Sequence, residues 1–138
     1  MAKAGSGTWT ASGSFFALSV SDATVTATWY REKLGFEVLR EGGSPDGGLR
    51  FALLRRGDHL IEVIQRKAAT APTAMPDRSF EQGIFKAGFW ITDLDGLASE
   101  LERTRTRFSH GIVVPPGADY RTFAVLDPDA NVVQFFGR

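Results

Sequence analysis

The sequence predicts an α+β domain made of two diverged βαβββ repeats, with mixed sheets enclosing one cleft and the helices packed outside. Two pairs of matching segments support this prediction. Residues 15–22 (FFALSVSD) and 86–93 (KAGFWITD) are both strand-like and both end in a polar residue and Asp, at an offset of 71. Residues 60–64 (LIEVI) match residues 132–136 (VVQFF) at an offset of 72. Two independent patterns at nearly one offset indicate a duplicated structural unit.

A helix is expected after the first strand of each unit. Asp22 and Asp93 stand where a carboxylate can accept hydrogen bonds from the free N–H groups of a first helical turn. After Asp93 the apolar residues fall at helical spacing, at positions 94, 97, 98 and 101. The first helix, over residues 22–34, has a weaker pattern because β-branched residues disfavour helix there. Gly35 fits its left-handed end, and its counterpart in the second unit favours a helix.

Three short strands are expected after each helix, separated by turns rich in Gly, Pro and Asp. In the first unit they span about 36–41, 49–55 and 59–65, and in the second unit about 107–114, 122–126 and 132–136. The predicted organisation is a flexible N-terminal arm at residues 1–13 and one domain at residues 14–138. That domain divides into unit one at about 14–66, a linker at about 67–83 and unit two at about 84–138.

Composition excludes several classes of function. Sixteen basic residues balance sixteen acidic ones, so the positive surface typical of proteins that bind nucleic acids or anionic membranes is not expected. The chain contains no cysteine, which excludes a disulfide framework, thiolate-bound zinc and a thiol nucleophile. This composition is compatible with the reducing cytoplasm, where we expect the protein to reside. The expected partner is a small molecule, with no nucleic acid and no membrane.

Several segments then resemble the vicinal oxygen chelate superfamily, which includes glyoxalases, bleomycin resistance proteins and extradiol dioxygenases. The resemblance runs from about residue 15 to residue 136 and rests on four segments: Val20-Ser21-Asp22, Trp29-Tyr30, Leu34-Gly35-Phe36 and Asp127-Pro128-Asp129-Ala130-Asn131. It implies the glyoxalase-like fold and a homodimer, in which the units pair within one chain or across two. It does not select one activity, because one scaffold serves many chemistries.

The resemblance also implies four positions for metal ligands, and these are Phe15, Glu62, Lys86 and Gln134 in this chain. Only Glu62 is a good ligand, because a phenyl ring cannot coordinate, an ammonium group repels a cation and an amide is a poor substitute for a carboxylate. His59 is three residues from Glu62 and therefore on the opposite face of a regular strand. His110 lies on a strand that supplies no ligand in the family. We therefore expect no metal and no other cofactor.

Strand alternation predicts the side chains that share a face with those four positions. They form a mostly apolar wall with a few polar groups, which is typical of a ligand site. The predicted ligand-binding residues are Phe15, Leu60, Glu62, Lys86, Trp90, Gln134 and Phe136. We also expect Lys86 to occupy the place of the lost cation and to pair with Glu62.

These residues leave three classes of function open. The preferred one is a metal-free protein of the bleomycin-resistance type that binds an apolar or aromatic metabolite or drug. The alternative is an enzyme, a lyase, isomerase or dioxygenase-like protein, with Glu62 as base or metal ligand and Lys86 as electrostatic stabiliser. A third class is an interaction module in which the aromatic residues fill the cleft as core.

Overall fold

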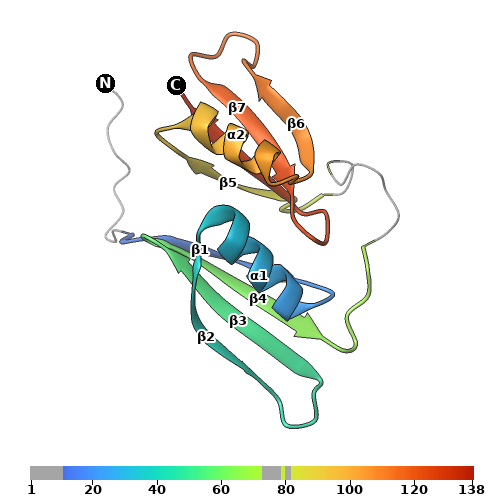
Figure 1. The fold of residues 1–138 in the computed structure, drawn as a ribbon. Helices are drawn as coiled ribbons and strands as arrows, with labels where there is room; N and C mark the ends of the chain where they lie inside the picture. Colours follow the sequence, from blue (N-terminus) through green and yellow to red (C-terminus); the bar gives the residue numbers. More distant parts are fainter. Residues whose placement is uncertain (1–10, 73–78, 80–81) are drawn as a thin grey trace.

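The computed structural model describes residues 11–72, 79 and 82–138, and in this part of the chain it contains two four-stranded sheets and two helices (Figure 1). The prediction of an α+β fold with two βαβββ units is confirmed. The first unit comprises β1 (Ser14–Ser19), α1 (Ala23–Leu34), β2 (Glu37–Gly43), β3 (Leu49–Arg56) and β4 (His59–Arg66). The second comprises β5 (Lys86–Trp90), α2 (Leu94–Arg103), β6 (Phe108–Val113), β7 (Arg121–Leu126) and β8 (Val132–Gly137).

The duplication extends to the pairing of the strands. The sheet orders are β1-β4-β3-β2 and β5-β8-β7-β6. Strand β1 runs parallel to β4, and β5 runs parallel to β8, while the other neighbouring pairs are antiparallel. Glu62 on β4 lies opposite Ala17 on β1 and Leu53 on β3. Gln134 on β8 lies opposite Gly88 on β5 and Ala124 on β7. Glu62 and Gln134, each with its two cross-strand neighbours, therefore occupy equivalent positions in the two units.

Both helices begin at the expected aspartates. The Asp22 carboxylate accepts from the Val25 N–H at 3.0 Å, and the Asp93 carboxylate accepts from the Gly96 N–H at 2.9 Å. Helix α1 ends at Gly35, which has a left-handed φ of 72°. Its β-branched residues do not prevent the helix, because α1 buries one face against the sheet, formed by Ala23, Thr26, Ala27, Tyr30 and Leu34.

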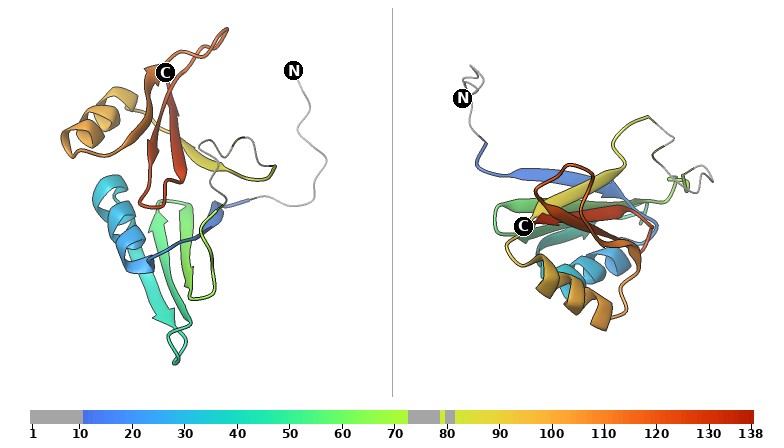
Figure 2. Two further views of the ribbon diagram at one scale, coloured as in Figure 1. Left: turned by 90° about the vertical axis from the view of Figure 1, so that its right-hand side faces the viewer. Right: turned by 90° about the horizontal axis from the view of Figure 1, so that it is seen from above.

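The core lies between the helices and the sheets. Both helices cover the same side of the two sheets, as Figure 2 shows. Phe89 on β5 joins the units, with its ring centroid 6.2 Å from that of Phe16 and 6.1 Å from that of Phe36 in the first unit. Leu101 is fully buried and Trp29 packs against the core from α1, as expected for helix faces that contact the sheets. The sheet surfaces turned away from the helices are called the open faces below.

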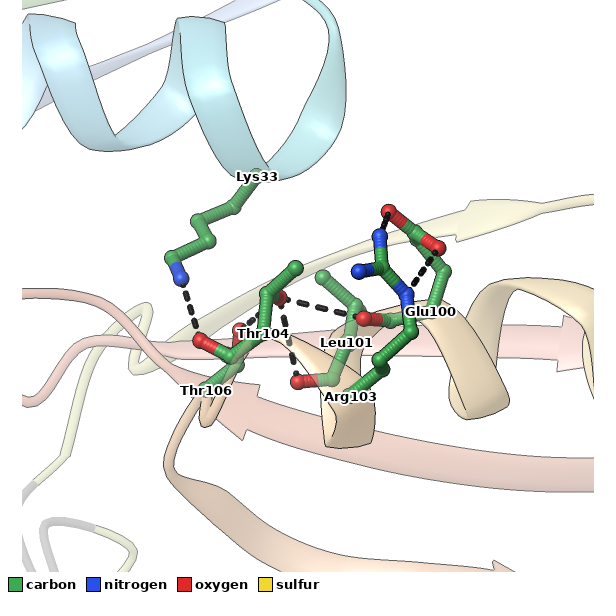
Figure 3. A network of polar contacts seen from close by, with 6 residues as sticks. All are labelled: Lys33, Glu100, Leu101, Arg103, Thr104 and Thr106. Atoms are coloured by element: carbon green, nitrogen blue, oxygen red, sulfur yellow. Dashed lines mark hydrogen bonds and ion pairs between the residues drawn. The ribbon is translucent and has the colours of Figure 1, made fainter.

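Polar contacts also hold the two units together. The Tyr30 hydroxyl on α1 donates to the buried Asp127 carboxylate at 3.0 Å, and the Ser21 hydroxyl donates to Asp129 at 2.6 Å. The Lys33 ammonium donates to the Thr104 carbonyl at 2.6 Å, so the C-terminal ends of α1 and α2 meet (Figure 3). A cation is favourable at this place because the carbonyl groups at a helix C-terminus carry partial negative charge.

No helix in the described part of the chain is long and apolar enough to cross a membrane. Two predicted segments fall partly outside the described residues. Residues 1–10 of the expected N-terminal arm (1–13) are not described, and neither are residues 73–78, 80 and 81 of the expected linker (67–83).

Candidate functional site

The open face of the second sheet carries an aromatic cluster formed by Trp90, Tyr120 and Phe136. The Trp90 and Phe136 rings are stacked at 5.4 Å between centroids, and Tyr120 meets them edge-on at 5.4 Å and 5.7 Å. Trp90 remains 63% exposed, so one side of this indole is available to a planar molecule. Gly88 makes room for the stack, because a Cβ at this position would come within 3.2 Å of the Phe136 ring.

Gln134 provides a polar group beside this cluster. It is only 8% exposed, and its amide nitrogen donates to the Thr122 hydroxyl at 2.8 Å. The amide oxygen has no hydrogen-bond partner among the described residues. Exchanging the amide oxygen and nitrogen would still leave one end unpaired, since Thr122 contacts a single end. A buried polar atom without a partner costs about 1–3 kcal/mol.

His110 belongs to the same row of the open face as Gln134. It lies opposite Ala124 on β7, and Ala124 lies opposite Gln134 on β8. Its Nδ1 is 2.9 Å from the Gly111 carbonyl, which can only accept, so Nδ1 is the donor of this hydrogen bond. From the sequence, His110 was set aside because its strand supplies no ligand in the family. The bulged register of β6, which only the structure shows, places it in this row. Tyr120 was also missed, since it lies in a turn with no periodic pattern.

The open face of the first sheet carries the remaining predicted residues. Phe15 is 64% exposed, whereas Leu60 and Glu62 are half-buried. Phe15 and Leu60 lie opposite one another on β1 and β4. The Glu62 carboxylate forms no hydrogen bond or ion pair in the described part of the chain, and its neighbours across the sheet are Ala17 and Leu53. Glu62 therefore has apolar neighbours across the sheet, and no cationic side chain among the described residues pairs with it.

The expected ion pair between Lys86 and Glu62 is not formed within the described structure. The Lys86 ammonium instead lies 5.3 Å from the centre of the Phe85 ring. Lys86 is the exposed first residue of β5, whereas Glu62 is in the middle of β4, in the other sheet. An exposed ammonium keeps its hydration, and an ion pair there would offer little in exchange. Phe15 and Lys86 nevertheless line one cavity of about 610 Å³ between β1 and β5.

The residues present do not fit a metal ion. No group of three or more His, Asp or Glu side chains in the described regions could hold one. Of the four positions implied by the family, Glu62 alone offers a carboxylate, and the amide of Gln134 is already bonded to Thr122. Divalent metals that act in enzymes require several oxygen or nitrogen ligands around one centre.

Comparison with known proteins agrees with this architecture. A model of the Glyoxalase/Bleomycin resistance protein/Dioxygenase superfamily matches residues 14–135. The chain belongs to this superfamily. No curated protein sequence matches the chain.

Three solved structures illustrate the likeness of fold. A glyoxalase family protein from Enterococcus faecalis is 22% identical, with a TM-score of 0.76 and coverage of 88% of this chain and 94% of that chain. A glyoxylase/bleomycin resistance protein/dioxygenase domain from Frankia sp. EAN1pec is 21% identical, with a TM-score of 0.74 and coverage of 95% and 93%. The trypanothione-dependent glyoxalase I of Leishmania major is 16% identical, with a TM-score of 0.67 and coverage of 89% and 84%.

Proposed function

We propose that this protein binds an apolar or aromatic small molecule, a metabolite or a drug, without a metal ion. The observation that carries the proposal is the combination of the exposed Trp90 ring with the unpaired amide of Gln134 on one open face. A planar ligand would stack on Trp90 and exchange a hydrogen bond with Gln134. Phe15, Leu60 and Phe136 would extend the apolar contact, and Lys86 would favour a ligand with negative charge.

The metal-free part of the proposal rests on ligand chemistry. Phe15 and Lys86 stand at two of the positions where the family uses metal ligands, and neither side chain binds a cation. Elemental analysis of the purified, dialysed protein tests this point. A stoichiometric divalent metal that is retained after dialysis would contradict it.

An enzymatic function remains the alternative, and Glu62 is the residue that favours it. A carboxylate with apolar neighbours and no ion pair in the described structure can act as a general base, and Lys86, which lies in the other sheet, would be an electrostatic stabiliser of the substrate. A lyase or isomerase reaction that begins with proton abstraction fits such a base. Activity that is abolished in Glu62→Gln, with ligand binding retained, would select the enzyme over the binding protein.

A thermal-shift screen of aromatic metabolites and antibiotics tests binding directly, because a ligand that binds only the folded state raises the melting temperature. Hits should quench Trp90 fluorescence, and Trp90→Ala should abolish binding. Trp29→Phe is the matched control, because Trp29 packs against the core from α1 and should leave affinity unchanged. Equal loss in both variants, or no hits in a broad screen, would contradict the proposal.

We further propose that the protein is a cytoplasmic homodimer. The superfamily resemblance motivates the dimer, and the absence of cysteine fits the reducing cytoplasm. Light scattering at high micromolar concentration should give twice the chain mass of 15.1 kDa. A monomer mass under these conditions would contradict the dimer.

A further inference from the structure

One pair of equivalent turns differs between the two units. Eight residues separate the paired Leu53 and Glu62 in the first unit, and nine separate the equivalent Ala124 and Gln134 in the second, so the connection from β7 to β8 is longer by one residue. The longer turn is held by a hydrogen bond from the Arg107 guanidinium to the Asp127 carbonyl at 2.8 Å. It reaches the other unit, where its Asp129 carboxylate contacts Ser21.

The contact between Asp129 and Ser21 is a carboxylate site built within the chain. The Ser21 backbone N–H donates to one Asp129 oxygen at 2.9 Å, and the Ser21 hydroxyl donates to the other at 2.6 Å. The repeat places Thr92 at the position equivalent to Ser21, with the same two kinds of donor. Thr92 has no hydrogen-bond partner in the described structure, and Asp58, the equivalent of Asp129, does not reach it.

A groove of about 340 Å³ occupies the place that the longer turn fills in the other half of the molecule. Its floor is aromatic and includes Phe36 and Phe89, and its rim carries Arg56, His59, Thr92 and Asp93. The Arg56 guanidinium is partly used, since one of its nitrogens donates to the Gly35 carbonyl at 3.2 Å. The volume is within the range of small-molecule sites. Phe89 and Phe135 line the groove from the core side of the second sheet, and Trp90, at the end of β5, borders both this groove and the open face.

We infer that this groove binds a small carboxylic acid with an aromatic body, at a second site distinct from the one proposed above. The carboxylate takes the place that Asp129 has at Ser21, accepting from the Thr92 N–H and hydroxyl. Arg56 and His59 supply positive charge or further donors, and a charged guanidinium strengthens such hydrogen bonds. The ring lies on Phe36 and Phe89.

The neighbouring Asp93 does not exclude an anion from the groove. Its carboxylate is engaged as the cap of α2, where it accepts from the Gly96 N–H. The equivalent residue Asp22 caps α1 in the same way and lies next to Ser21. Asp129 binds Ser21 beside this capping carboxylate, so the chain itself contains two carboxylates in the arrangement that we infer.

An NMR titration of the ¹⁵N-labelled full chain with sodium phenylacetate tests the inference. Shifts should centre on the amides of Thr92 and Asp93, with a dissociation constant on the order of 1 mM, which is typical for so small a ligand. Phenylacetamide, which has the same shape without the charge, should bind at least about tenfold more weakly. Shifts confined to Gln134 and its neighbours, or no shift at Thr92, would overturn the inference.

Two adjacent arginines give a matched pair of variants. Arg56→Gln should weaken phenylacetate binding by about tenfold or more, because it removes the guanidinium at the rim. Arg55→Gln should leave binding unchanged, because Arg55 points to the opposite face of β3 and pairs with Glu37. Equal affinity in the two variants would overturn the inference.

Replacing Gly57-Asp58 by Pro-Asp-Ala, the central residues of the longer turn, should close the groove and abolish binding of phenylacetate.

The groove and the open-face site can be tested separately, so evidence against one proposal does not contradict the other. Gln134→Leu should affect ligands of the open face and leave phenylacetate binding unchanged. Phenylacetate binding that is lost in Gln134→Leu and kept in Arg56→Gln would assign the acid to the open face and overturn the second site.

Discussion

The Asp127 carboxylate is fully buried, and both of its oxygens accept hydrogen bonds. It accepts from the backbone N–H groups of Asp129 and Asn131, from the Asn131 side-chain amide and from the Tyr30 hydroxyl, at 2.8–3.0 Å. The first three bonds shape the turn, and the fourth ties the turn to α1 in the other unit. The segment 127–131 carried part of the family resemblance, and its role in this chain is to lock the two units together.

Tyr30→Phe should lower the free energy of unfolding by about 1–3 kcal/mol, because it removes one donor from a buried carboxylate. Tyr120→Phe is the control, since Tyr120 lies on the open face and its hydroxyl has no hydrogen bond in the described structure. Urea denaturation of the two variants and the unmodified protein measures the difference. Equal losses would show that the bond to Asp127 contributes nothing specific.

Burial, together with the charge and hydrogen bond of Asp127, raises the pKa of Tyr30 far above its ordinary value of 10.0. The unfolded chain then loses this proton above about pH 10 while the folded chain keeps it, so stability falls as pH rises through this region. The slope should approach about 1.4 kcal/mol per pH unit and should be absent from Tyr30→Phe. Denaturation curves of both proteins, collected from about pH 9 to pH 11, measure this slope.

At the scale of the elements, α1 forms against its local propensity. Thr24, Val25, Thr26 and Thr28 disfavour helix, yet residues 23–34 are helical because Tyr30 and Leu34 bury their side chains against the sheet. The cap at Asp22 and the stop at Gly35 define its ends. The helix is therefore specified by its two ends and by tertiary packing together.

Gly35→Ala should destabilise the fold by about 1 kcal/mol, because a φ of 72° is unfavourable for alanine and the new Cβ would meet the Arg56 guanidinium. Gly111→Ala is a matched control, because nothing lies within 4 Å of its Cβ position. It should change stability by less than about 0.5 kcal/mol. Thermal unfolding of both variants measures the contrast, and an equal effect would show that the left-handed stop is not required.

At the scale of the whole molecule, the two units share one core, and Phe89 lies where they meet. Its ring is near Phe16 and Phe36 of the first unit and near Phe135 of its own unit. Stability is therefore a property of the pair of units, and each unit covers apolar surface of the other.

Phe89→Ala should lower the free energy of unfolding by about 3 kcal/mol, because it opens a cavity between the units. Phe15→Ala is the control on the neighbouring first strand, where the ring is 64% exposed on the open face. Its loss should be below about 1 kcal/mol. Chemical denaturation distinguishes the two, and a larger effect of Phe15→Ala would indicate that the open face is covered in solution.

The sequence by itself determined the repeat, the helix caps and nearly all strand bounds, as at 49–55, where the strand ends one residue later. These are local properties, because strand alternation and capping depend on residues within one turn or one strand. Only the tertiary structure decided which distant groups meet. Tyr30 reaches Asp127, His110 joins the row of Gln134, and Lys86 does not reach Glu62. Such contacts depend on how the two sheets are placed relative to one another, which no local pattern in the sequence specifies.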